Sequence, residues 1–364
     1  MAMILFLVVI FFYGLYTKWG TRIPDTLKPP QTQKYSVVLT TYGSQDDQGH
    51  WQGEAAPYME RLVSGINVSS RYPMCIRAYK GYLFSQPVLI IISGQAKVRM
   101  AACMENILEK DGNGIKEVVL SGTAGITPAR GGLVGSTGKL SRTDLVMIGD
   151  VCINSGAFDF DQQHYSSDIQ NTKNPDPVFW NYTSENSAGF VDGSHPLANE
   201  LYAASHKVVW PSVSSDVISA NLKYHQVSRS PKSWGPTQCL ESTDDLFWHD
   251  SRSDLRARII GAGWLNSTQG LNLTSDDILI ATSMEAVPAG AVINWWNQTN
   301  KTQIAFAYVR GASNFDQPWV NNQGVPQENG KTSLESGTSA AFSQLASFTA
   351  SLPVLKMLEL RNYD

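Results

Sequence analysis

The stretch from Ile278 to Asp316 constrains the fold of this chain more than any other part of the sequence. Two apolar runs flank a helical pattern, at residues Ile278 to Ala281, Ile304 to Val309 and, between them, Ala289 to Trp296. Apolar runs of this length are typical of buried strands. A strand, a helix and a second strand in this order predict a βαβ unit.

Polar side chains follow both strands of this unit. Met284 and Glu285 occupy the turn after the first strand, and Arg310, Ser313 and Asn314 come at the end of the second. Open α/β sheets place their binding sites where strands end. We therefore expect a functional site at this edge of the sheet.

The composition limits the classes of partner. At 364 residues, the chain is long enough for one large α/β domain or two ordinary ones, and a hydrophobic content of 42% supports a core. Its net charge is −4. Binding to a nucleic-acid polymer needs clusters of Lys and Arg that neutralise phosphates, so we expect no nucleic-acid partner.

An apolar run of about fifteen residues opens the chain and is followed by Lys18 and Arg22. A stable membrane span needs about 20 residues, so residues 1–20 are predicted to be a secretory signal. The run lacks a basic segment before it, which leaves an uncleaved signal anchor as the alternative and a buried helix as a third interpretation. Prolines predict a linker over residues 21–33, followed by a single domain over residues 34–364. No other membrane contact is expected.

Six N-x-S/T sequons support entry into a secretory route, at Asn67, Asn181, Asn266, Asn272, Asn297 and Asn300. Such sequons accept N-glycans on secreted proteins. We expect a glycoprotein that is secreted or lies in an endomembrane or vacuolar lumen. An asparagine-rich chain also produces sequons by chance, which is the alternative interpretation.

The four cysteines are few for a secreted scaffold, at positions 75, 103, 152 and 239. One or two disulfides fit this number. Cys103 falls on a helical pattern and Cys152 in a strand, so we interpret both as buried thiols.

Further elements follow from the same patterns. Strands are predicted at residues 35–43, 87–92 and 117–126, and an amphipathic helix at 93–110. Residues 144–153 predict a strand pair or a strand with a turn at Gly149. A long C-terminal helix is expected to bend or break near Pro353. Residues 164–238 are rich in Asn, Asp, Ser and Pro, and we interpret them as a polar insertion on the surface of the domain.

Six short motifs occur in order along the chain: Ser93-Gly94-Gln95-Ala96-Lys97, Ser121-Gly122-Thr123-Ala124-Gly125, Gly149-Asp150, Asp245-Leu246-Phe247-Trp248, Ser283-Met284-Glu285-Ala286 and Arg310-Gly311-Ala312-Ser313-Asn314. In order and rough spacing the chain resembles the nucleoside phosphorylase superfamily, which includes purine nucleoside and uridine phosphorylases, nucleosidases and bark-storage proteins. The resemblance covers about residues 35–352.

The resemblance implies a three-layer α/β domain with a central mixed, mostly parallel β-sheet flanked by helices. It also implies an enzyme that cleaves the N-ribosidic bond of purine nucleosides by phosphorolysis or hydrolysis. No cofactor is expected, and inorganic phosphate is the candidate co-substrate. The partner is then a small-molecule nucleoside, and relatives of this kind form homo-oligomers.

The family's motifs imply roles for individual residues. Glu285 would hold the ribose hydroxyls, since a carboxylate accepts hydrogen bonds from two adjacent hydroxyl groups, and Met284 would pack on the sugar. Arg310 is expected to form a supporting ion pair with Glu285, with anion binding or anchoring of the strand end as the alternatives. Phe247 and Trp248 match the aromatic wall beside the purine, with core packing as the alternative.

Two further sets of residues take places near the ligand. Phe158 and Ser313 match positions beside the base. The side of the phosphate or water is matched by small residues that let backbone N–H groups approach a ligand, namely Gly43, Gly122, Thr123 and Gly125.

One departure from the family concerns the proton donor. Asn314 stands where many relatives carry the Asp that protonates the purine, and an amide cannot be a general acid. Loss of a proton donor costs roughly two to four orders of magnitude in rate. Asp316 is the candidate replacement. A leaving group that needs less help, such as an oxopurine, or vestigial activity are the alternatives.

The second departure is Leu120, which stands where phosphorylases carry an Arg. A phosphate dianion needs cationic neutralisation, for which Arg130 is a candidate. Water as the nucleophile is the simpler interpretation. Nucleosidases keep a water-activating Glu after the first strand, and the candidates here are Asp46, Asp47 and Glu54.

Both departures leave a second class of function open, a non-catalytic storage-like or nucleoside-binding relative. A role in nucleoside uptake is a third, although the sequence has no further span to support transport. Zinc-ligand spacing, a P-loop and a nucleophile elbow are missing from the sequence.

Overall fold

The computed structural model of the chain describes residues 34–131, 144–160, 189–225, 227–244, 251–317 and 340–362. Residues 34–364 form one compact unit. The signal and linker expected over residues 1–33, and the sequon at Asn181, lie outside the described residues.

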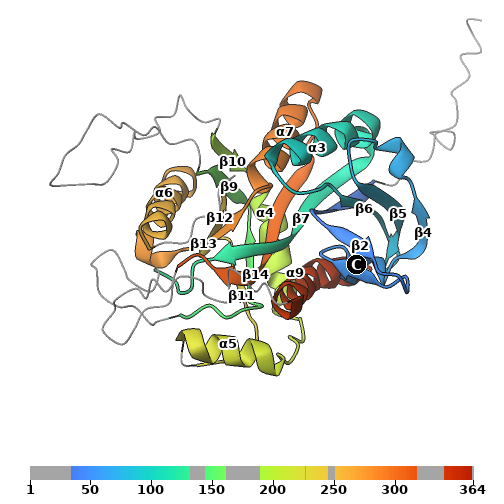
Figure 1. Cartoon of the computed structure of the whole chain (residues 1–364). Helices are drawn as coiled ribbons and strands as arrows, with labels where there is room; N and C mark the ends of the chain where they lie inside the picture. The colour runs from blue at the N-terminus through green and yellow to red at the C-terminus, as the bar shows by residue number, and fades with distance from the viewer. Residues whose placement is uncertain are drawn as a thin grey trace, which may run out of the picture. The chain divides into compact units, whose positions relative to one another are not determined.

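A mixed β-sheet forms the centre of this unit (Figure 1). Its main path runs through β10 (Phe190–Asp192), β9 (Gly156–Asp159), β12 (Cys239–Thr243), β13 (Leu279–Ser283), β7 (Ile115–Ile126), β1 (Tyr35–Thr40), β6 (Gln86–Ile92), β5 (Arg77–Leu83) and β4 (Val63–Asn67). Three further strands branch from β7 in the order β14 (Ala305–Phe315), β8 (Val151–Asn154) and β11 (Ser233–Trp234). A separate hairpin joins β2 (Gly43–Gln45) to β3 (Trp51–Gly53).

The centre of the sheet is parallel. β1 pairs in parallel with β6 and β7, and β7 pairs in parallel with β14. Antiparallel pairs occur at the edges, such as β4 with β5 and β5 with β6. The side chains of β1 alternate, with Val37 and Leu39 in one core cluster and Val38 in another. This arrangement explains why β1 and β6 are continuous apolar runs, since both faces of the strands are buried.

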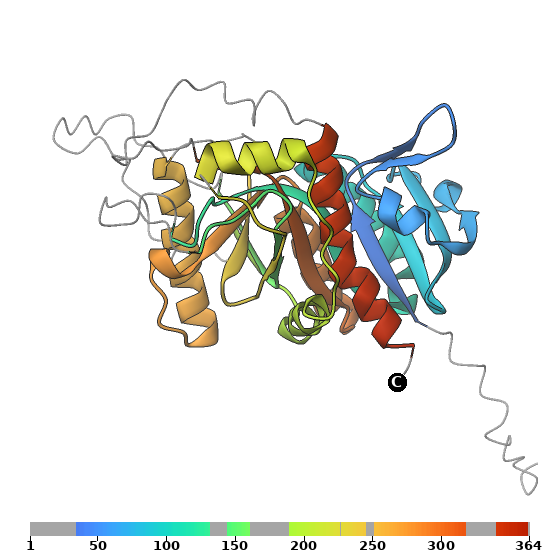
Figure 2. The same cartoon turned by 90° about the horizontal axis from the view of Figure 1, so that it is seen from below.

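Helices cover both faces of the sheet (Figures 1 and 2). On one face, α3 (Lys97–Asp111) and α7 (Ala286–Asn300) pack Ile107 and Ile293 into the core. On the other, α4 (His195–Ser205) and α9 (Ala340–Leu360) bury Leu201 and Ala350. The remaining helices are α2 (Ala56–Met59), α5 (Ser215–His225) and α6 (Ser251–Gln269). The predicted fold class, a three-layer α/β domain with a mixed, mostly parallel sheet, is confirmed.

The βαβ unit predicted between Ile278 and Asp316 consists of β13, α7 and β14. The predicted order of strand, helix and strand is confirmed, but the two strands are not neighbours. The end of β7 lies between them, pairing antiparallel with β13 at Ile126 and Ala281 and parallel with β14. Both strands therefore deliver their ends to the end of β7.

Three expectations about elements are wrong, the last of them only in part. α9 runs through Pro353 as one helix, because Val354, Leu355 and other apolar residues of its turns pack into the core. The region expected to be a surface insertion contains α4, which forms part of the core. Of the strand pair or strand with a turn expected over residues 144–153, the part before the turn is not a strand, whereas the turn at Gly149 and a strand from Val151 are present.

Two disulfides join all four cysteines, Cys75 to Cys103 and Cys152 to Cys239. The interpretation of Cys103 and Cys152 as buried thiols is therefore wrong. The Cα atoms of the pairs lie 4.7 and 5.8 Å apart, within the range of natural disulfides. Pairs 28 and 87 residues apart in sequence come together only through the tertiary fold.

Two sequon asparagines act as internal clamps where helices lead into strands. In α6, Asn266 exchanges two hydrogen bonds with the backbone of Leu273, at 2.7 and 2.8 Å. In α7, Asn297 does the same with Ile304, at 2.9 and 3.0 Å. Each amide closes the loop after its helix.

Among the described residues, no helix is long and apolar enough to cross a membrane.

Candidate functional site

A cleft of about 610 Å³ lies where β1, β7, β13 and β14 end. Its walls include Thr41, Thr123, Met284, Glu285 and Ser313. A second hollow, of about 660 Å³ at the β4–β5 edge, shares no residue with this cleft and is largely apolar. The polar cleft is therefore the candidate site, at the sheet edge that the sequence predicts.

A carboxylate occupies a cradle of donors at one side of the cleft. Glu54, which follows β3, is buried, and its Oε2 accepts hydrogen bonds from Thr41 N at 2.8 Å and Thr41 Oγ1 at 2.7 Å. Its Oε1 accepts from Thr123 N at 2.7 Å and Thr123 Oγ1 at 3.1 Å. Two carboxylate oxygens offer about four acceptor positions, and these donors use all of them.

The cradle depends on Gly122. A side chain at this position would collide with the Glu54 carboxylate. The small-residue turn that the sequence assigns to ligand approach thus admits a carboxylate of the chain itself. Of the three acidic candidates for activating water, Glu54 lies in the cleft, while Asp46 and Asp47 are exposed in the β2–β3 hairpin.

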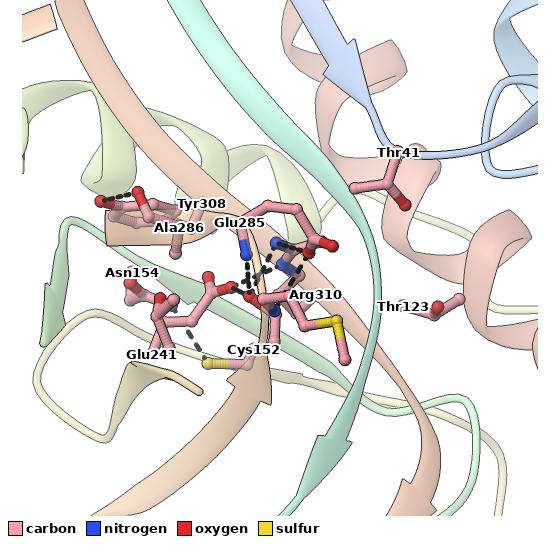
Figure 3. Close-up of polar contacts among 12 residues, drawn as sticks. Thr41, Thr123, Cys152, Asn154, Glu241, Glu285, Ala286, Tyr308 and Arg310 are labelled. Atoms are coloured by element: carbon pink, nitrogen blue, oxygen red, sulfur yellow. Dashed lines mark hydrogen bonds and ion pairs between the residues drawn. The ribbon is translucent and has the colours of Figure 1, made fainter. Parts of the chain in front are cut away.

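Glu285 is a second carboxylate of the wall (Figure 3). It follows β13 directly and stands at the start of α7. Burial raises the pKa of Glu285 from its ordinary 4.5 to about 7, with the nearby carboxylates Glu54 and Glu241 adding to the rise and Arg310 opposing it. This side chain therefore changes its charge close to neutral pH.

Arg310 links two carboxylates beneath the cleft (Figure 3). It is fully buried, donates from Nε to Glu241 Oε1 at 2.8 Å, and lies 3.4 Å from Glu285 Oε2 through Nη2. The expected ion pair with Glu285 is present. Ser283 Oγ also contacts Glu241 and accepts from Arg310 Nη2 at 3.0 Å.

The end of β14 places three polar residues near Gly125. Ser313 lines the cleft, and its Oγ lies 2.9 Å from Asn314 Oδ1. Asp316 is fully buried and accepts from Thr282 Oγ1 at 2.8 Å, and burial raises its pKa well above the usual range. Asp316 therefore keeps its proton to higher pH than an exposed Asp.

Both candidate catalytic residues, Asn314 on β14 and Asp316 just after it, adjoin Gly125. A side chain on Gly125 would collide with Asp316 Oδ1 and crowd Asn314 Nδ2. Neither Asn314 nor Asp316 is part of the described cleft wall, whereas Gly125 is. They therefore lie behind the wall at this glycine.

The other predicted site residues are dispersed. Phe158 is buried in a core cluster with Trp264 and is not part of the described wall. Gly43 packs against Ala55, and Arg130 forms an ion pair with Asp144 at 2.6 Å. The aromatic pair Phe247 and Trp248 lies outside the described residues.

Sequence reasoning did not identify several residues of the site. Glu241 is one, since β12 reads Cys-Leu-Glu-Ser-Thr and nothing in this pattern separates its acid from a surface residue. The wall also contains Gln95, which lies in the first of the six motifs but was assigned no role, and Gln52, Ser343 and Gln344, for which the sequence offers no signal. The described wall holds two carboxylates, Glu54 and Glu285, and no Lys or Arg.

No model of a protein family and no curated protein sequence matches the chain. Solved structures similar to it over 90% of its length include the 5′-methylthioadenosine/S-adenosylhomocysteine nucleosidase of Neisseria meningitidis in complex with methylthio-immucillin-A, at 15% identity, 99% coverage of that chain and a TM-score of 0.47. The futalosine hydrolase of Helicobacter pylori is similar at 14% identity, 98% coverage and a TM-score of 0.47.

A 5′-methylthioadenosine/S-adenosylhomocysteine nucleosidase of Colwellia psychrerythraea in complex with adenine is similar over 90% of this chain and 95% of its own, at 17% identity and a TM-score of 0.48. These proteins are members of the superfamily that the sequence motifs resemble.

Proposed function

We propose that this protein hydrolyses the N-ribosidic bond of purine nucleosides, with water as the nucleophile. The observation that carries the proposal is the Glu54 carboxylate in the cradle of Thr41 and Thr123. Two backbone N–H groups and two hydroxyls at strand ends would suit a phosphate oxyanion. In this chain these four donors already hold the carboxylate of Glu54.

Phosphate is disfavoured for two reasons. A dianion beside Glu54 would meet a like charge in a partly buried site, where such repulsion is strong. In addition, the described wall of the cleft supplies no Lys or Arg to neutralise phosphate. The same charge pattern favours an uncharged nucleoside over a nucleotide as substrate.

Glu54 is the candidate base. Its longest contact, at 3.1 Å, is with the hydroxyl of Thr123, which is only partly buried. A water molecule that displaces this hydroxyl would donate to Glu54 Oε1. Glu54 then takes a proton from the water, its oxygen bonds to the sugar C1′, and the electron pair of the breaking C–N bond leaves with the purine.

Glu285 is the candidate ribose clamp. In its ionised form the carboxylate can accept hydrogen bonds from both ribose hydroxyls, and Met284 lies beside it in the wall. Stabilising the sugar as positive charge develops at C1′ lowers the barrier. The clamp is ionised above about pH 7, as the pKa of Glu285 indicates.

The purine must gain a proton as it leaves. Asn314 lies behind the wall at Gly125, and its amide cannot protonate the base. Burial raises the pKa of Asp316 well above the usual range, and Asp316 adjoins the same glycine, so we assign to it the role of proton reserve. The role given to Asp316 is part of the proposal.

One observation favours a second function, that of a non-catalytic nucleoside-binding or storage protein. The position at the end of β14 that should carry a proton donor is Asn314, and Asp316 lies behind the described wall. Binding needs only Glu285 and the wall, whereas cleavage needs Glu54 and a proton source as well.

Release of free base separates the two functions. We expect purified protein to release adenine or hypoxanthine from adenosine or inosine, and Glu54→Gln to lose roughly two to four orders of magnitude in rate. Bound nucleoside that remains intact in the wild-type protein would favour the binding function and contradict hydrolysis.

We also propose that the protein works in a secretory or lumenal compartment. Two disulfides are typical of oxidising compartments. Sequon asparagines 67, 272 and 300 are exposed, whereas the amides of Asn266 and Asn297 serve as loop clamps. Peptide mapping of the secreted protein would locate glycans, which we expect at the exposed asparagines.

A further inference from the structure

We infer that Glu241 is a positioning residue, which holds the guanidinium of Arg310 so that Glu285 is presented to the ribose hydroxyls. The inference rests on the site proposed above. Glu241 is not itself part of the described cleft wall but contacts Ser283, which is, so it acts through its neighbours.

The position of Glu241 calls for an explanation. It lies in the middle of β12, fully buried between Leu240 and Ser242. A buried carboxylate costs several kcal/mol unless it is paired and hydrogen-bonded. Its partners are Arg310 and Ser283, which both adjoin Glu285.

The contacts are asymmetric. Arg310 Nε lies 2.8 Å from Glu241 Oε1, whereas Arg310 Nη2 lies 3.4 Å from Glu285 Oε2. Because a guanidinium is planar and rigid, anchoring its Nε edge fixes the position of Nη2. The closer contact is therefore the anchor of the guanidinium, and the longer one leaves Glu285 Oε2, which also accepts from the backbone N–H of Met284 at 3.2 Å, as the end that faces a ligand.

Ser283 provides a second connection. Its hydroxyl donates to Glu241 Oε1, accepts from Arg310 Nη2 at 3.0 Å, and accepts from the backbone N–H of Glu285 at 3.4 Å. Glu241 therefore fixes both the side-chain partner of Glu285 and the hydroxyl that contacts its backbone. Without Glu241, Arg310 would be free to close on Glu285 and occupy the oxygens that a ribose needs.

The chain offers a matched control. Glu117 is also a buried glutamate that accepts from a serine, Ser36 Oγ at 2.6 Å, and pairs with an arginine, Arg361. It lies at the other end of β7 and takes no part in the cleft. Glu117→Gln therefore reproduces the loss of a buried Glu–Ser–Arg network without touching the proposed clamp.

The test compares the affinities of two ligands by calorimetry, a purine ribonucleoside and its 2′,3′-dideoxy analogue. We expect Glu241→Gln to weaken ribonucleoside binding roughly tenfold or more, as for loss of a hydrogen bond to a charged group, and to leave the dideoxy analogue unchanged. Glu117→Gln should leave the ratio of the two affinities as in the wild type. Equal weakening of both ligands by Glu241→Gln, or no weakening, would overturn the inference.

A ligand-free readout keeps the inference testable if the wild type binds no nucleoside, a result that would contradict the proposed function. The pKa of Glu285 is raised from 4.5 to about 7, so the folded protein retains a proton that the unfolded chain has lost. The free energy of unfolding therefore falls as pH rises through this window. We expect the midpoint of this loss to move to lower pH in Glu241→Gln, and an unmoved midpoint would overturn the inference.

Discussion

At the residue scale, the position of Glu54 has the clearest consequence. Removing its carboxylate leaves the donors of Thr41 and Thr123 free to bind another anion. We expect Glu54→Ala to be stabilised by inorganic phosphate in a thermal unfolding assay, and the wild type to be unaffected. A phosphate-dependent shift in the wild type would contradict a cradle filled by Glu54.

The charge of Glu285 gives a prediction for pH. Its pKa of about 7 means that the clamp gains its charge as pH rises through neutrality. We expect the Kd for a purine ribonucleoside to decrease between about pH 6 and about pH 8, because the ionised carboxylate accepts hydroxyl hydrogen bonds. In Glu285→Gln this pH dependence should vanish, and its persistence would assign the titration to another group.

The sequence predicted some of these residues and missed others for a physical reason. Met284, Glu285 and Ser313 were found because they lie in local motifs at strand ends. Glu54 was one of three acids in one loop, and only the fold decides which of them turns inward. Glu241 was missed because its partners come from other strands.

At the scale of elements, the Asn297 clamp at the end of α7 is testable. Its amide makes hydrogen bonds of 2.9 and 3.0 Å with Ile304 and accepts one of 2.8 Å from Thr302. We expect Asn297→Ala to lower the free energy of unfolding by about 1–3 kcal/mol, since partly buried backbone groups lose their partners. Asn300→Ala, in an exposed part of the same helix, is the matched control and should change stability little.

Strands were the most predictable elements, and their pairing the least. β1, β6 and β7 are recognisable in the sequence as apolar runs, because both of their faces are buried. The branching of β14 and β13 around the end of β7 has no local signature. The continuity of α9 through Pro353 was also unpredictable, since packing along the helix outweighs the missing hydrogen bond.

At the scale of the whole molecule, the Cys152–Cys239 disulfide joins β8 to β12 across 87 residues of sequence. A loop of this length contributes about 4.6 kcal/mol in the chain-entropy model. We expect the double variant Cys152→Ala with Cys239→Ala to lose stability of this order in denaturant unfolding. The pair Cys75 and Cys103 closes only 28 residues and should matter less. Equal losses for the two pairs would contradict this ranking.

The site itself is a property of the whole domain. The cradle joins β1 to β7 through Glu54, and the clamp joins β12, β13 and β14 through Arg310. Segments that lie more than two hundred residues apart in sequence meet at one cleft, which is why motifs indicated the chemistry but not its arrangement.

The sugar product formed with and without inorganic phosphate tests the central claim most directly. Hydrolysis directed by Glu54 predicts free ribose from a purine nucleoside at a rate independent of added phosphate. Ribose 1-phosphate that forms only when phosphate is present would contradict it.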